Sequence, residues 1–175
     1  MVRGTFSPAR AWWLAAGPAS TRTFGTTFKA LTMPKALRIA LSVIAGFLLG
    51  SAVNMSLLAI GGKLIPPPAG ANVSTMEGLK AALPLFEARH FLFPFLAHAL
   101  GTLAGVMVPA VFGSVSAKVC ALIVGLLFLA GGVANVVMLP SPLWFTAVDL
   151  LFAYIPAAWL GYALGCKLRA ARGGA

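Results

Sequence analysis

The chain has 175 residues, of which 60% are hydrophobic and only 9% are charged, and its mean hydropathy is +0.96. These values lie outside the range of soluble globular proteins and leave room for one compact membrane domain. The formal net charge of +10 does not indicate a nucleic-acid-binding protein, because the basic residues flank apolar segments and do not cover a folded face.

Residues 1–34 differ from everything that follows. They are basic and free of acidic side chains, and their apolar patch Ala11–Ala16 is too short to span a membrane. Three interpretations stay open for this extension: a disordered basic tail, an organelle transit peptide, or an over-long gene model. The third is favoured by Met33-Pro34-Lys35, which stands directly before an apolar span as a natural start would.

Charged side chains are absent from three long segments of 24, 28 and 30 residues, and Asp149 stands alone before a further uncharged segment. About 20 apolar residues are needed to cross the hydrocarbon core of a bilayer. The sequence therefore predicts an all-α membrane protein with four transmembrane helices in one bundle. The bundle occupies residues 35–170, with spans at about 39–60, 91–111, 117–139 and 144–166.

A polar loop joins the first two spans and opens with Lys63 and a stiff run of three prolines, 66–68. Ser74 and Glu77 have the spacing of a capping box, in which the Ser74 side chain accepts from the Glu77 amide. This pattern predicts a short amphipathic helix that Pro84 ends. We expect it to lie on the membrane surface or across the mouth of the bundle.

The distribution of Lys and Arg predicts the orientation. Ten of the thirteen lie before the first span, between the second and third spans, or after the last span. The remaining three, Lys63, Lys80 and Arg89, lie in the first loop. Both termini are therefore expected in the cytoplasm and the long loop outside, as in a multi-pass protein of a bacterial inner membrane.

Each predicted span carries one polar residue near its outer end: Asn54, His98, Asn135 and Asp149. At about 1.5 Å per residue along a helix, all four fall roughly 7–12 Å below the outer surface. We therefore predict an intramembrane polar cluster in the bundle interior.

Asp149 is the most informative of the four, because a carboxylate in hydrocarbon costs at least a few kcal/mol unless it is paired or protonated. Its expected partner is His98, with Asn54 and Asn135 donating hydrogen bonds. Such a cluster could relay a proton, hold a cation with the amide oxygens, or act as a base on a lipid-soluble substrate. Alternatively, the four side chains only satisfy one another and fix the register of the helices.

The outer loop offers three further candidates, Glu77, Glu87 and His90. Glu87 and His90 are three residues apart and could share a metal ion, although two ligands do not make a specific site. The preferred interpretation places His90 as a cap at the start of the second span. We predict no metal site and no cofactor, since no nucleotide-binding loop, redox cysteine pair or zinc motif is present.

Several motifs resemble a family of small bacterial four-span integral membrane proteins with no assigned function. They are Val53-Asn54-Met55, Ile65-Pro66-Pro67-Pro68, Met76-Glu77-Gly78, Ala97-His98-Ala99 and Tyr154-Ile155-Pro156, together with Asp149. The similarity covers about residues 35–166. It implies a fold and a location in the bacterial envelope, and it implies no mechanism.

Three classes of function are compatible with these observations. The protein is a non-enzymatic scaffold or accessory subunit, a small transport unit that handles a proton or cation at Asp149 and His98, or an enzyme on a membrane-dissolved substrate. We favour the non-enzymatic classes. The expected partners are the lipid bilayer and either further copies of the chain or another membrane protein, with no nucleic acid.

Overall fold

The computed structural model describes residues 33–112 and 116–173, and all regular elements in these two ranges are helical. Four helical segments are long and apolar enough to cross a membrane, which confirms the predicted all-α, multi-pass architecture. The three interpretations of the N-terminal extension concern residues 1–32, which lie outside the described ranges.

The four apolar helical segments have the following bounds. The first is α1 (Lys35–Leu64), and the second is a short turn followed by α3 (Leu92–Phe112). The third is α4 (Ala117–Met138), and the last is a composite helix of α5 (Leu143–Val148), η4 (Asp149–Tyr154) and α6 (Ile155–Gly173).

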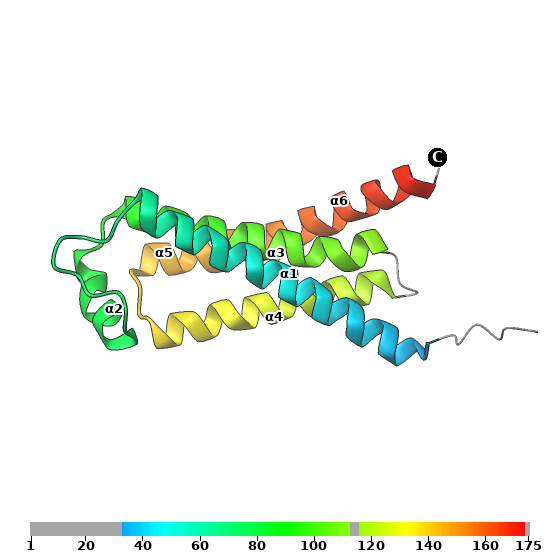
Figure 1. Cartoon of the computed structure of the whole chain (residues 1–175), viewed down its shortest axis with the longest axis horizontal. Coiled ribbons are helices and arrows are strands. Elements are labelled where there is room, and N and C mark those ends of the chain that lie inside the picture. The colour runs from blue at the N-terminus through cyan, green and yellow to red at the C-terminus, as the bar shows by residue number, and fades with distance from the viewer. Residues whose placement is uncertain (1–32, 113–115, 174–175) are drawn as a thin grey trace, which may run out of the picture. The chain divides into compact units, whose positions relative to one another are not determined.

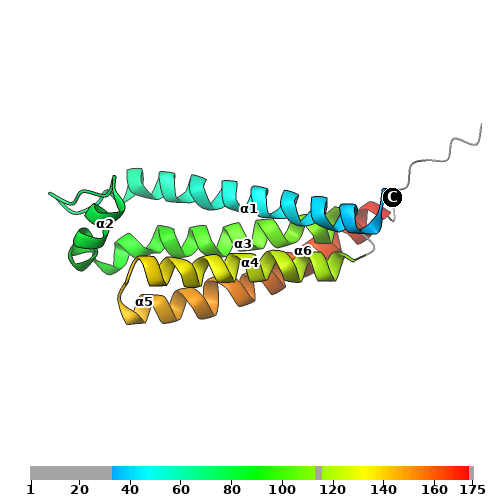
Figure 2. The same cartoon turned by 90° about the horizontal axis from the view of Figure 1, so that it is seen from below.

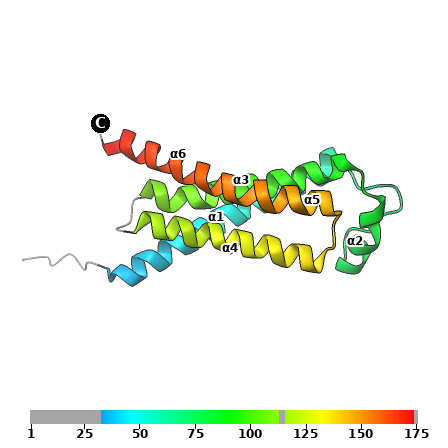
Figure 3. The same ribbon diagram turned by 180° about the vertical axis from the view of Figure 1, so that it is seen from behind.

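Helix α3 lies at the centre of the described bundle and contacts α1, α4 and α6. Seen from below, α1 and α5 lie on opposite sides, with α3 and α4 between them (Figure 2). The view from behind shows α5 and α6 running on as one long helix beside α3 (Figure 3). The helices that carry Asn54, Asn135 and Asp149 therefore all contact α3, which carries His98.

The contact between α1 and α3 depends on glycines that face each other. A Cβ atom on Gly50 would lie 2.5 Å from the carbonyl oxygen of Gly101, and one on Gly101 would lie 2.9 Å from the Gly50 carbonyl oxygen. Only glycine allows two backbones to approach this closely, and such contacts drive helix association in lipid, where hydrophobic burial gives no advantage. Helix α1 is otherwise largely exposed, so this narrow seam holds it to the bundle.

Helix α1 is longer than predicted, because it begins one turn before Ile39 and continues to Leu64, past Lys63. A lysine near a helix end can keep its stem along the apolar helix while its ammonium group reaches the polar interface. A charged side chain therefore marks the edge of the hydrocarbon layer and need not mark the end of the helix.

The connection between α1 and α3 contains the short helix α2 (Met76–Ala82). The predicted cap at Ser74 is wrong by one residue, because the Thr75 hydroxyl accepts from the Gly78 amide at 3.0 Å. Ser74 instead donates from its hydroxyl and its amide to the Asn72 side chain, at 2.6 and 3.0 Å. This local turn occupies Ser74 and moves the helix start along the chain.

An aromatic cluster joins this connection to the end of the bundle. Leu83, Phe91 and Phe145 are buried together, with the Phe91 and Phe145 ring centroids 4.6 Å apart. The second core cluster lies deeper, where Val106, Val124, Phe128 and Tyr154 pack against one another. His98 and Asp149 lie between these two apolar layers, since His98 follows Phe91 and precedes Val106, and Asp149 follows Phe145 and precedes Tyr154.

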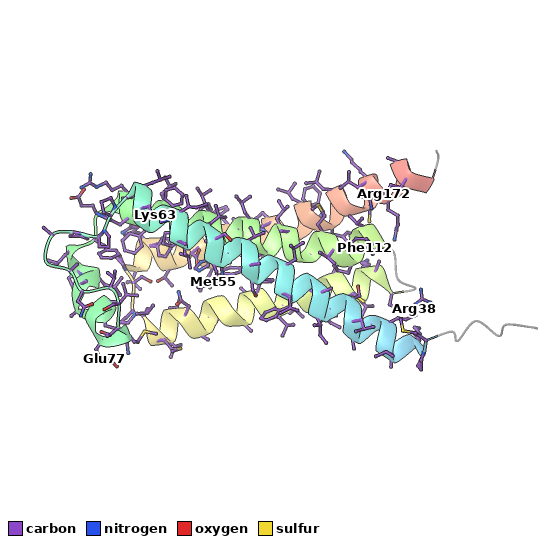
Figure 4. All side chains as sticks on the ribbon, viewed as in Figure 1. Arg38, Met55, Lys63, Glu77, Phe112 and Arg172 are labelled. Atoms are coloured by element: carbon purple, nitrogen blue, oxygen red, sulfur yellow. The ribbon has the colours of Figure 1, made fainter. Side chains whose placement is uncertain are left out.

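The two ends of the bundle carry different charges. Arg38 and Arg172 lie at one end together with Phe112, while Lys63 and Glu77 lie at the other (Figures 1 and 4). We call the first the basic end, since its charged residues are all basic: Lys35, Arg38, Lys118, Lys167, Arg169 and Arg172. We call the other the loop end, because it carries the long connection with α2.

The glycine seam predicts a difference between two otherwise similar substitutions. Gly50→Ala places a methyl group against both the Gly101 carbonyl and the Phe128 ring, so we expect a loss of about 1–3 kcal/mol of stability. Gly131→Ala is the matched control, because no atom lies within 4 Å of its Cβ and alanine favours the helix by roughly 0.5–1 kcal/mol. Thermal unfolding in detergent tests both, and equal stability of Gly50→Ala and wild type would contradict the close α1–α3 contact.

Candidate functional site

Asp149 lies at the start of η4, a stretch of wide π-helical turns between α5 and α6. Pro156 follows this stretch, and its ring has no N–H and crowds the carbonyl oxygen of Phe152 four residues earlier. The regular α-helical hydrogen bonds are therefore disrupted over η4, and wide turns of this kind are frequent at functional sites. The Asp149 side chain points inward and only 2% of it is exposed.

The imidazole of His98 on α3 contacts both oxygens of this carboxylate. Its Nδ1 lies 2.8 Å from Oδ1 and 2.9 Å from Oδ2 of Asp149. An ionised carboxylate can only accept hydrogen bonds, so beside one the Nδ1 atom of His98 is the donor to both oxygens. Only 12% of the His98 side chain is exposed, so this charge-assisted contact is screened little by solvent.

Tyr154 is a third member of the site, and the sequence analysis did not identify it as one. Its hydroxyl donates to Oδ2 of Asp149 at 3.4 Å, and its ring stacks on the His98 ring with centroids 5.6 Å apart. The ring and hydroxyl also lie against Gly132 of α4, at the place that a Cβ atom would occupy. Glycine at position 132 therefore makes room for the tyrosine.

Local geometry explains why Tyr154 was missed. Residues five apart point to different sides of an α-helix, which has about 3.6 residues per turn. The wide turns of η4 bring Asp149 and Tyr154 onto the same side. A sequence search for partners at three or four residues cannot find this pair, and only the position of Pro156 hints at it.

The predicted hydrogen bonds from Asn54 and Asn135 to the pair are wrong. Asn54 lies against Gly101, and its Oδ1 atom is buried without a hydrogen-bond partner. The structure therefore joins His98 to Asp149 and shows no hydrogen bond from either asparagine to this pair.

Thr102 is buried completely beside the site, one helical turn from His98 on α3. Its hydroxyl oxygen has no hydrogen-bond partner. No sequence pattern points to Thr102, because a threonine within an apolar helix usually bonds to its own backbone.

A cavity of about 190 Å³ at the loop end reaches His98. Asn135 shares this cavity, so the structure brings Asn135 near His98 without a bond to Asp149. The other lining residues come from α1, the connection and both neighbouring helices: Leu58, Leu79, Leu83, Phe86, His90, Phe91, Pro94, Leu139, Ser141 and Phe145. His98 therefore lines the cavity, whereas the Asp149 carboxylate does not.

The three candidates of the first loop do not form a site together. Glu77 is exposed, and the Glu87 carboxylate pairs with Arg89 at 3.0 Å, on side chains that are both 65% exposed. His90 is buried, and its Nδ1 accepts the Glu87 amide at 3.0 Å, which is the capping role that the sequence favoured. Among the described residues no three His, Cys, Asp or Glu side chains come together as metal ligands would.

Comparison with protein-family models, curated proteins and solved structures finds no match to this chain. The resemblance to small four-span bacterial proteins therefore stays a prediction.

The unpaired Thr102 hydroxyl predicts the effect of an isosteric substitution. Thr102→Val removes a buried polar group that has no partner, so we expect stability to be unchanged or raised by about 1 kcal/mol. Thermal unfolding in detergent measures this change in stability. A clear loss of stability would show that the hydroxyl forms a hydrogen bond in the membrane.

Proposed function

We propose that this chain is a small proton-handling unit of the membrane, in which His98 and Asp149 together bind and release one proton. The observation that carries the proposal is the contact of His98 Nδ1 with both oxygens of a buried carboxylate, at 2.8 and 2.9 Å. An intramembrane acid is costly, and such residues usually mark proton or ion pathways. Histidine is the side chain whose charge changes most readily near neutral pH.

The geometry suggests which atom takes the proton. With Asp149 ionised, Nδ1 of His98 donates to it, and Nε2 is the ring nitrogen left to accept a proton. Without this proton the pair carries one net negative charge, and with it the imidazolium and carboxylate balance. Because a net charge is unfavourable in hydrocarbon, proton binding at Nε2 removes an electrostatic cost. The Tyr154 hydroxyl stabilises the carboxylate in both states.

The cavity at the loop end supports access from that side. His98 lines it while Asp149 does not, so a proton arriving through the cavity meets the imidazole first. We further propose that this end faces outward and that both termini are cytoplasmic, in a bacterial inner membrane. The excess of basic residues, ten against three, supports this orientation.

A scaffold is the second candidate, and one observation favours it. Both Asp149 oxygens already have partners within the bundle, as expected for a pair that only fixes helix register. An enzyme on a membrane-dissolved substrate is favoured less. A lipid-facing groove does run beside the last helix, but neither His98 nor Asp149 lines it.

Proton binding by the pair can be observed directly by infrared difference spectroscopy of the protein in liposomes during a pH change. We expect imidazole and carboxylate bands from one proton-binding site, which disappear in both Asp149→Asn and His98→Gln. Thr102→Val is the control, since it changes a buried neighbour of His98 that does not ionise, and its spectrum should match wild type. Bands that persist in both variants of the pair would refute the proposal.

Stability separates the two candidate functions. Asp149→Asn keeps the shape of the side chain and an acceptor for His98, but it removes the charge that costs at least a few kcal/mol in hydrocarbon. If the acid serves proton handling, this variant should be as stable as wild type or more stable, while proton flux into liposomes is lost. If the pair is a structural lock, Asp149→Asn and His98→Ala should each lower the unfolding temperature, with strongly non-additive effects in the double variant.

A further inference from the structure

A second cavity, of about 310 Å³, forms a groove between α4 and the last helix on the basic side of the His98–Asp149 pair. Its walls are apolar side chains of α3, α4 and α6, and Leu122 and Trp159 on its rim are 62% and 69% exposed. In a membrane such exposed side chains face the acyl chains of lipids. The groove is therefore open to the bilayer, and its size is at the low end of the roughly 300–1,000 Å³ that is typical of ligand pockets.

Lys118 is the one charged residue that lines this groove. It is exposed in the first turn of α4, where the basic end of the bundle begins. No acidic side chain of the described residues forms an ion pair with it. The three acids of the whole chain are Glu77, Glu87 and Asp149, and none of them belongs to the basic end.

We propose that this groove binds one anionic phospholipid, with an acyl chain between α4 and α6 and the phosphate at Lys118. Basic residues beside grooves between transmembrane helices are suited to anionic lipid headgroups. A second copy of the chain in the same orientation is a poor occupant, because it would bring six more basic residues and no acid to this end. This inference does not depend on proton handling by His98 and Asp149.

Trp159 on the groove rim makes the test direct. The chain has four tryptophans, and Trp12→Phe, Trp13→Phe and Trp144→Phe together leave Trp159 as the only one. Its fluorescence is then compared in liposomes that contain equal fractions of brominated phosphatidylglycerol or brominated phosphatidylcholine. We expect phosphatidylglycerol to be preferred about fivefold, which corresponds to the roughly 1 kcal/mol that one basic side chain contributes near anionic lipid.

Two variants of this single-tryptophan protein show whether a preference for phosphatidylglycerol depends on Lys118. Lys118→Gln should abolish it, while Lys35→Gln, which removes a charge at the same end but outside the groove, should leave it intact. Equal quenching by both lipids would overturn the proposal, and so would a preference that survives Lys118→Gln. Weak quenching by either lipid would show that another protein segment covers the groove, and would also overturn it. Native mass spectrometry of the unaltered protein should show phosphatidylglycerol retained over phosphatidylcholine.

Discussion

The hydrocarbon core of a membrane offers no hydrogen bonds, so a polar group of this chain within the core is costly unless a partner lies inside the bundle. The backbone meets this constraint by forming helices along four spans. Asp149 meets it through His98 and Tyr154, at 2.8 to 3.4 Å. Because His98 and Asp149 are 51 residues apart in the sequence, their contact fixes the last helix against α3 at one level. The same contact is thus both a packing constraint and a chemical site.

Much of the fold could be predicted from the positions of the charged residues alone. A helix that crosses the hydrocarbon core needs about 20 residues without charged side chains, and such uncharged segments are visible in the sequence. His98 and Asp149 could be predicted for the same reason, as polar residues stranded in such segments. The positions of the Asn54 and Asn135 side chains could not, because the sequence does not show which neighbours a polar side chain meets inside the packed bundle. Tyr154 could not, because its approach to Asp149 needs the wide turns of η4.

Glycines contribute both to the close contact of two backbones and to the polar site. Gly50 and Gly101 hold α1 against α3, and Gly132 leaves space for the Tyr154 ring. Small residues in these helices therefore have two different effects: some let backbones meet, and one lets a large polar side chain lie between helices. The spacing of small residues in the sequence shows the first effect, while the second depends on which side chain faces the glycine.

Tyr154 connects the two regions for which functions are proposed. Its hydroxyl donates to Asp149 and its ring stacks on His98, while the same side chain lines the lipid-facing groove. His98 in turn lines the cavity at the loop end. A molecule in the groove would contact the ring that orients the carboxylate, and any displacement of this ring would weaken the hydrogen bond to Oδ2. Of the three residues of the site only Tyr154 lines the groove, so a molecule bound there would reach the His98–Asp149 pair through this ring.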